Sequence, residues 1–303
     1  MRVELATIAL AAAIGAVATY ALAHPFDSAM HRWEAALAVA LCGLALAWLT
    51  MRALRGSAAR RWLALAGIGG LAITIAILGA ELLVGPAQRV AGAPGQTYRP
   101  QGSARLAVMF PPLSPGDLAA GRSAGAVTVL TGTREEQLAI GQQLRSHSYV
   151  VRADSWPAAY VRAWSTAHLA QTVTQPSSVV FVSPVLQFPT LDTDGMLTDT
   201  FAVPALHREV HVRYYSGLPS RGIDVPFLQL RIDEENGGAL FDGVAVSGRP
   251  VRKAGLELVF DLGAYPVVSI AGAPDVFVYR TGIALIIAGV LGWLVAVQRP
   301  PRR

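Results

Sequence analysis

The sequence predicts an α-helical membrane bundle of four spans, with a β-rich α+β domain inserted between the third span and the fourth. Hydrophobic residues make up 53% of the 303 residues and charged residues 15%, whereas about a quarter of the residues in an average soluble protein are charged. Four segments are long and apolar enough to cross a bilayer core, which takes about 20 residues. The segments 1–85, 86–275 and 276–303 therefore divide into three spans, one domain of ordinary length, and a fourth span with a basic tail.

The four predicted spans run from about Val3 to Ala23, Trp33 to Met51, Trp62 to Gly85 and Val276 to Val297. The last two are rich in glycine, which lets helix backbones approach closely in lipid. We expect packing within one bundle, or against a partner membrane protein, through Gly67, Gly69, Gly70, Gly282, Gly289 and Gly292. The sequence Ala21-Leu22-Ala23 also fits a leader-peptidase site, so cleavage of the first span stays an alternative.

Arginine is distributed unevenly around these spans. The loop between spans two and three contains four arginines and the C-terminal tail three, whereas the loop between spans one and two contains one. Positive side chains of short loops stay in the cytoplasm. We therefore expect a multi-pass protein of the bacterial inner membrane, with both termini in the cytoplasm and segment 86–275 in the periplasm or outside the cell. Membrane lipid is an expected partner and nucleic acid is not, because no basic stripe carries interleaved aromatic residues.

The first half of segment 86–275 predicts a small α/β unit. Short apolar runs predict strands at 105–110, 127–130 and 148–151. Between the last two, Thr133 and Glu136 form a capping-box pattern, which favours a helix from Thr133 to about Arg145.

The second half predicts an antiparallel sheet or a small β-sandwich. Residues 209–214 alternate between apolar and polar, which places Val210, Val212 and Tyr214 on one face of a strand. Runs 225–232 and 239–246 flank a loop of turn residues and predict a hairpin. Further strands are expected at 178–182, 256–260 and 266–270.

The reactive residues argue against an enzyme. Cys42 is the only cysteine, which excludes an internal disulfide, a cysteine-rich zinc site, a CxxC redox pair and covalent c-type haem attachment. The sequence contains no GxSxG elbow, P-loop, HExxH motif or EF-hand loop. Asp192 and Asp194 precede Gly195 in the order of a calcium loop, but its closing glutamate is missing. We therefore expect an ordinary turn there and no metal site.

Four histidines are candidate cofactor ligands, because imidazole binds haem iron and transition metals. His24 and His31 fall in the short loop at the expected outer face of the membrane. His207 and His211 flank the start of a strand, and their even spacing puts them on one side of an extended segment. In the alternative interpretation, His207 and His211 face solvent on a strand, and His24 and His31 are interfacial residues without a ligand role.

The layout of three spans, an outward β-rich domain and one terminal span resembles ResB-type cytochrome c biogenesis proteins. The best local similarity covers Gly255 to Phe260, Val267 to Ile270 and Asp275 to Tyr279, followed by Gly282 in the last span. The exit from span three, with Gly92 and then Gly95-Gln-Thr-Tyr98, is also similar, as is Cys42 followed by Arg52. The third span has no histidine, so no membrane haem ligand is carried over.

The resemblance implies a non-enzymatic protein that assists cytochrome c maturation at the outer face of the inner membrane. Such proteins work with a second membrane protein that carries a tryptophan-rich haem-handling motif, so haem and that protein are the implied cofactor and partner. The alternative is an accessory structural subunit of a respiratory or photosynthetic membrane complex. The glycine-rich spans and an outward domain without catalytic motifs motivate this alternative. A membrane-anchored enzyme is the third hypothesis.

Overall fold

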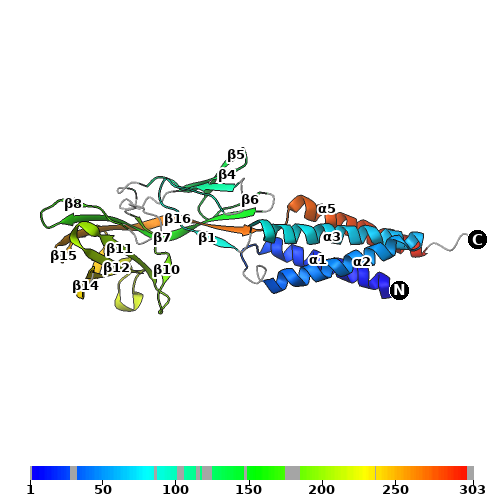
Figure 1. Cartoon of the computed structure of the whole chain (residues 1–303), viewed down its shortest axis with the longest axis horizontal. Coiled ribbons are helices and arrows are strands. Elements are labelled where there is room, and N and C mark those ends of the chain that lie inside the picture. Colours follow the sequence, from blue (N-terminus) through cyan, green and yellow to red (C-terminus); the bar gives the residue numbers. More distant parts are fainter. Residues whose placement is uncertain are drawn as a thin grey trace, which may run out of the picture.

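The computed structural model describes residues 2–27, 33–84, 87–100, 106–113, 117, 125–146, 149–174, 185–235 and 237–298. The molecule is elongated, with the helices gathered at one end and the sheets at the other (Figure 1). The first helix begins, and the last helix ends, at the end of the molecule that lies away from the sheets.

The four apolar segments predicted from the sequence are confirmed as helices. They are α1 (Arg2–Ala23), α2 (Trp33–Leu54), α3 (Ala58–Val84) and α5 (Val276–Gln298). Each is long and apolar enough to cross a membrane, which indicates a multi-pass membrane protein. A β-rich region separates α3 from α5, as the sequence predicts.

Helix α3 lies at the centre of the bundle and packs against the other three helices. Its contact with α5 is made by glycines, as expected from the small residues of both segments. A methyl group built on Gly289 would lie 2.5 Å from the backbone nitrogen of Ala66 and 2.7 Å from the carbonyl oxygen of Trp62. One built on Gly282 would lie 2.8 Å from the carbonyl oxygen of Gly69. The two backbones are therefore too close to admit side chains at these positions.

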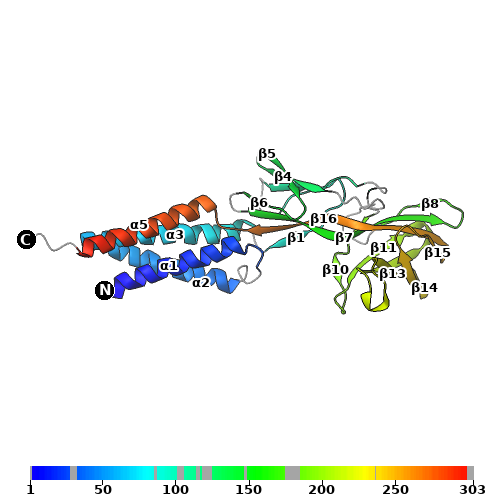
Figure 2. The same cartoon turned by 180° about the vertical axis from the view of Figure 1, so that it is seen from behind.

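Two strands of 17 residues each, β7 (Tyr149–Ser165) and β16 (Leu256–Gly272), pair antiparallel along their whole length. At 3.3 Å per residue this ribbon is roughly 55 Å long. Figure 2 shows it running from the helices to the far end of the β region. Shorter strands pair along its two sides and complete a seven-stranded sheet: β1 (Gln88–Val90), β6 (Gln143–Ser146), β8 (Ala170–Gln171), β9 (Val185–Leu186) and β15 (Val251–Lys253).

A separate four-stranded sheet packs on the half of the ribbon nearer the helices and forms the proximal core. Its strands are β2 (Thr97–Tyr98), β3 (Leu106–Met109), β4 (Ala126–Thr131) and β5 (Arg134–Ala139). Val108 and Val129 from this sheet are buried against Val151, Val268 and Tyr265 of the ribbon. Apolar residues of both layers are thereby removed from water, which is the main stabilising contribution to the sandwich.

A five-stranded sheet packs on the other half of the ribbon and forms the distal core. It consists of β10 (Thr190–Leu191), β11 (Leu197–Val203), β12 (Arg208–Tyr215), β13 (Phe227–Glu234) and β14 (Ala239–Val246), joined in chain order by antiparallel pairing. Phe201, Val210 and Leu230 from this sheet are fully buried with Leu258 and Phe260 of the ribbon. The one ribbon therefore links two sandwiches.

The helix predicted from Thr133 to Arg145 is wrong. Residues 134–139 form β5, which pairs with β4 from Ala126↔Ala139 to Thr131↔Arg134, and the rest of the segment leads into β6. Gly132 has a φ of +64°, so the chain turns sharply at the residue before the capping-box pattern. Glycine adopts this conformation without steric cost, and the hairpin it permits buries Leu138 in the proximal core.

Most of the predicted strands are confirmed, with different lengths. The strands expected at 105–110, 127–130, 209–214, 225–232 and 239–246 correspond to β3, β4, β12, β13 and β14. The runs 256–260 and 266–270 belong to one strand, β16, and 148–151 to the beginning of β7. The strand expected at 178–182 lies outside the described residues.

Candidate functional site

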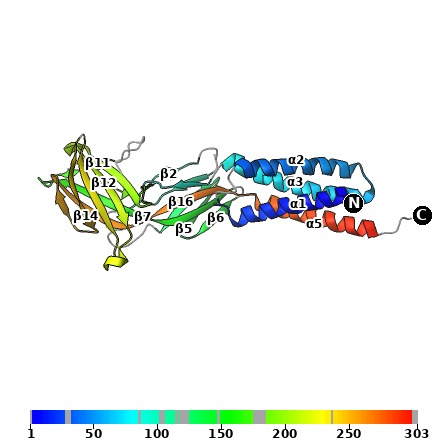
Figure 3. The ribbon, with the colours of Figure 1, turned by 90° about the horizontal axis from the view of Figure 1, so that it is seen from below.

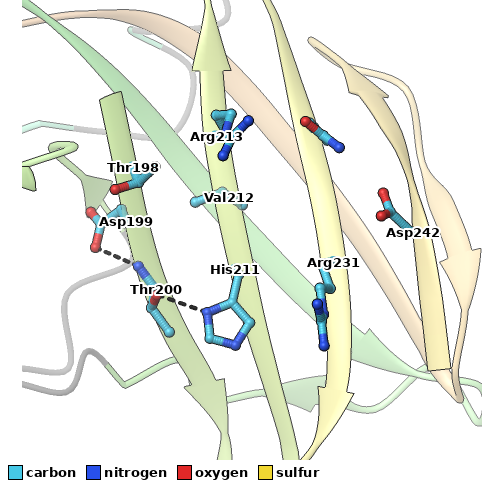
Figure 4. Close-up of a pocket in the computed structure, with 9 residues that line it drawn as sticks. Thr198, Asp199, Thr200, His211, Val212, Arg213, Arg231 and Asp242 are labelled. Carbon is cyan, nitrogen blue, oxygen red and sulfur yellow. Dashed lines mark hydrogen bonds between the residues drawn. The ribbon is translucent and has the colours of Figure 1, made fainter. Parts of the chain in front are cut away.

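A polar groove with a volume of about 380 Å³ lies on the solvent-facing side of the five-stranded sheet (Figure 4). Strands β11, β12, β13 and β14 each contribute to its lining. We call it the outer-face groove, formed by Thr198, Thr200, His211, Arg213, Gln229, Arg231 and Asp242.

Strand register brings these side chains together. Thr200 pairs with His211, His211 with Arg231, and Arg231 with Asp242. The four residues therefore form one row across four strands, and Figure 4 shows His211, Arg231 and Asp242 on three neighbouring strands. Successive side chains of a strand point to opposite faces of the sheet. The residues that alternate with the groove residues along each strand, such as Val210 and Leu230, therefore point into the distal core.

His211 has a partner at each ring nitrogen. Its Nδ1 lies 3.1 Å from the Thr200 hydroxyl oxygen, and its Nε2 lies 3.3 Å from Oδ2 of Asp233. When Nε2 donates to the carboxylate, Nδ1 accepts from the hydroxyl. The ring therefore holds its two neighbours in place across the sheet.

Hydroxyl, imidazole and carboxylate in this order are also the parts of a nucleophilic triad. Acyl transfer needs, in addition, donors aimed at the developing oxyanion. The backbone N–H of Thr200 donates to Oδ1 of Asp199 at 2.8 Å. His211 lies on β12, which pairs with β11 on one side and β13 on the other, so its N–H belongs to the sheet ladder. The backbone N–H groups of Thr200 and His211 therefore do not form an oxyanion hole for this set of side chains.

Two guanidinium groups give the outer-face groove fixed positive charges. Arg231 donates from Nε to both oxygens of Asp233, at 2.9 and 3.1 Å. The hydrogen bond and the charge of Asp233 raise the pKa of Arg231 above its ordinary value. A hydrogen bond with Tyr215, and then the charge of Asp192, raise the pKa of Arg213 in the same way. Both arginines stay protonated, and each has an acidic neighbour.

The segment from Asp192 to Gly195 forms the turn between β10 and β11. Oδ1 of Asp192 accepts hydrogen bonds from the backbone N–H groups of Asp194 and Met196, both at 2.9 Å. Its other oxygen lies 2.6 Å from a guanidinium nitrogen of Arg213. Asp192 therefore closes a turn and anchors Arg213.

His207 does not share a strand face with His211, so the inference from their even spacing is wrong. His207 caps the short 3₁₀-helix η1 (Pro204–Leu206) with a left-handed φ of +53°, and β12 begins only at Arg208. Its Nδ1 lies 2.6 Å from Oε2 of Glu235, and the ring is largely exposed. His207 and His211 thus contact different carboxylates.

His24 lies just beyond the last residue of α1, where its ring stacks on Tyr20 with centroids 4.5 Å apart. That end of α1 adjoins the β region, and β12 lies at the opposite end of the ribbon (Figure 1). His24 is therefore remote from His207 and His211. His31 lies outside the described residues.

The outer-face groove does not fit haem. Iron ligation needs a free ring nitrogen, and both nitrogens of His211 are engaged. The lining is charged and hydroxylic, whereas sites for flat organic cofactors are mostly apolar. In the described ranges, no three His, Cys, Asp or Glu side chains converge in a way that could hold a metal ion.

Only His211 among the groove residues follows from the sequence as a candidate. The sequence pattern that indicates further groove residues is the alternation of apolar and polar residues in β12 and β13. Arg213, Gln229 and Arg231 occupy polar positions of this alternation. The cross-strand partners Thr200 and Asp242 depend on pairing between strands, which the local pattern does not specify.

No protein-family model and no curated protein matches the sequence. Among solved structures, a crystal structure of Xanthomonas campestris FlgL is similar at 12% identity, over 94% of this chain and 93% of that chain. The TM-score is 0.15, which is the level of unrelated folds, so this likeness indicates neither fold nor function.

Proposed function

We propose that this chain is a non-enzymatic protein of the bacterial inner membrane that assists cytochrome c maturation at the outer face of the bilayer. In this proposal the four helices span the membrane with both termini in the cytoplasm. The arginine-rich turn between α2 and α3 lies at the end of the bundle farthest from the sheets (Figure 3). Since arginines favour the cytoplasmic side, the β region would be exported.

The observation that carries the proposal concerns the segment that resembles ResB-type proteins. Gly255 to Gly282 is one continuous structural unit, comprising strand β16, a short connection and the first turns of α5. Within this unit, strand β16 contributes residues to both cores, and helix α5 follows it after a short connection. The similarity thus falls on the part that links the exported sheets to the bilayer.

Contacts at the junction hold the β region against the bundle. Arg145 of β6 donates a hydrogen bond of 2.6 Å to the carbonyl oxygen of Leu22 in the last turn of α1, and burial lowers the pKa of Arg145. The guanidinium of Arg152 lies 4.6 Å from the centroid of the Phe26 ring. These contacts, together with the connection from β16 to α5, attach the near end of the ribbon to the bundle. The distal sheet packs on the other end of this ribbon, which is roughly 55 Å long.

The outer-face groove is the proposed binding surface for a partner. Its alternating charges and hydroxyl groups offer several hydrogen bonds on a rigid sheet, which suits a polar protein surface. Because the groove does not fit haem, the proposal places haem on the partner. This chain would position the partner, and it would make or break no bond.

Deletion of the gene in its host tests the proposal. Haem staining of denaturing gels should show loss of covalently attached cytochromes c, and the full-length chain should restore them. The variant Arg213→Ala with Arg231→Ala should fail to restore them, whereas Arg249→Ala with Arg134→Ala, two exposed arginines outside the groove, should succeed. Normal cytochrome c levels in the deletion strain would overturn the proposal.

A second candidate function is an accessory subunit of a respiratory or photosynthetic membrane complex. The observation in its favour is the exposure of α5: 11% of its apolar window is buried within the chain, against 56% for α3. Such a surface faces either lipid or the helices of another protein. Stoichiometric co-purification with a respiratory or photosynthetic complex, combined with unaltered cytochrome c, would favour this function.

A further inference from the structure

The turn between α2 and α3 concentrates positive charge at one end of the bundle. Arg52 lies in the last turn of α2 and Arg55 directly follows that helix, whereas Arg60 and Arg61 lie in the first turn of α3. All four side chains are exposed. We call these four residues the arginine turn.

Within the part of the chain that the structure describes, one of these four cations forms an ion pair. Among the described residues, the only ion pair of the arginine turn joins Arg60 to Glu4 of α1, at 2.8 Å. Glu4 is nearly buried, so this pair holds α1 against α3. No carboxylate in the described part of the chain lies within ion-pair distance of Arg52, Arg55 or Arg61.

The ring of Trp48 lies next to one of these cations. The guanidinium of Arg52 lies 5.3 Å from the centroid of the Trp48 ring. Trp48 is 60% exposed and Trp62 is 44% exposed. Exposed tryptophan side chains near the end of a membrane helix are typical of the interface between lipid tails and headgroups. The rings mark the depth at which lipid glycerol groups would lie.

The arginine turn also borders a small cleft where three helices meet. Val3, Glu4 and Thr7 of α1, Arg52 and Ala53 of α2, and Arg60 and Leu63 of α3 line it. Basic clefts between membrane helices recognise lipid headgroups, because a phosphate satisfies several guanidinium donors at once.

We propose that the arginine turn binds the phosphate of an anionic glycerophospholipid from the surrounding leaflet. Arg52, Arg55 and Arg61 supply the donors, and Trp48 and Trp62 contact the glycerol region. This inference rests on membrane insertion of the helices, and it depends neither on their orientation nor on a role in cytochrome c maturation.

Native mass spectrometry of the full chain in mild detergent tests the proposal, with phosphatidylglycerol and phosphatidylcholine of identical acyl chains as probes. We expect phosphatidylglycerol to bind on the order of tenfold more tightly. The variant Arg52→Gln, Arg55→Gln and Arg61→Gln should lose this preference. A control variant with the same charge change in the β region, Arg99→Gln, Arg134→Gln and Arg249→Gln, should keep it.

Two further measurements keep the proposal falsifiable if the glutamine variant does not fold. The corresponding triple lysine variant should retain the preference for phosphatidylglycerol, and millimolar inorganic phosphate should leave the bound lipid in place. Equal binding of the two lipids to the unmodified chain would overturn the proposal. So would full displacement by inorganic phosphate, which would show a site for soluble anions, or an unchanged preference in the folded glutamine variant.

Discussion

At the residue scale, single polar contacts join parts of the chain that are distant in sequence. Tyr265 of the ribbon is 1% exposed, and its hydroxyl donates a 2.7 Å hydrogen bond to the carbonyl oxygen of Pro111. Arg145 ties the β region to α1 in the same manner. None of these pairings is visible in the local sequence, because each depends on the tertiary fold.

The variant Tyr265→Phe should lower the free energy of unfolding by about 1 kcal/mol at neutral pH, because the Pro111 carbonyl loses its donor. Urea unfolding of the β region, followed by tryptophan fluorescence, measures the change. Tyr98→Phe is the control, since the Tyr98 hydroxyl makes only a 3.2 Å bond to a partly exposed glutamine. An equal loss in both variants would contradict the assignment.

Tyr265 should also make stability fall in alkaline solution. Burial raises the pKa of Tyr265 above its ordinary value of 10.0. When the unfolded chain ionises more readily than the folded chain, the contribution of the group is complete below the unfolded pKa and is lost as the pH rises above it. Unfolding measured from about pH 9 to about pH 11 should show a shallower decline for Tyr265→Phe than for the unmodified chain. Parallel declines would refute this.

The variant Arg145→Ala should loosen the junction between sheets and helices. We expect the free energy of unfolding to fall by about 1.5 to 3 kcal/mol, the contribution of a hydrogen bond with a charged donor. Hydrogen exchange should accelerate at the last turn of α1, and thermal unfolding in detergent should occur at a lower temperature. Arg134→Ala, an exposed arginine on β5, is the control and should have no effect. Unchanged exchange in Arg145→Ala would show that the junction is held elsewhere.

At the element scale, the sequence predicts the apolar helices well and the longest strands poorly. Helix ends agree within a few residues because length and hydropathy alone define a span. Strands β7 and β16 contain Pro157 and Pro266, which argue against interior strand positions. In the structure both prolines lie where side strands leave gaps: β1 pairs only with residues 268–270 of β16, and β9 only with residues 159–160 of β7.

The helix predicted from the capping-box pattern also failed because tertiary pairing decides the structure of this segment. The propensity of Thr133 to Glu136 for a helix start is real, yet Gly132 allows a tight turn that pairs β5 with β4. Burial of Leu138 in the proximal core outweighs the local preference. For the candidate site, alternation identifies the outward side chains of β12, and only the register reveals their neighbours.

Glycine packing between α3 and α5 gives a prediction at this scale. Gly289→Leu should destabilise the bundle by about 3 kcal/mol or more, because the side chain would overlap the α3 backbone. Thermal unfolding and monodispersity in detergent are the measurements. Gly79→Ala, where an added methyl group meets nothing within 4 Å, should leave both unchanged. Equal stability of the two variants would exclude close α3–α5 packing.

At the scale of the whole molecule, the chain joins an apolar helical bundle to an elongated β region. The single ribbon contributes to both cores, and its β16 strand is followed directly by α5, so the distal sheet is linked to the helices through this ribbon. The arginine turn lies at the opposite end of the long axis (Figure 3). The two ends therefore differ in chemistry: one carries four exposed arginines and the other carries the outer-face groove.

The central claim is that the bilayer separates these ends, with the sheets outside and the arginine turn inside. Single cysteines at Ser220→Cys, in the exposed 3₁₀-helix η2 (Pro219–Arg221), and at Ser57→Cys, beside the arginine turn, test it in a Cys42→Ala background. A membrane-impermeant maleimide applied to intact spheroplasts should label Ser220→Cys at once and Ser57→Cys only after lysis. Labelling of Ser57→Cys in intact spheroplasts, with protection of Ser220→Cys, would contradict the account.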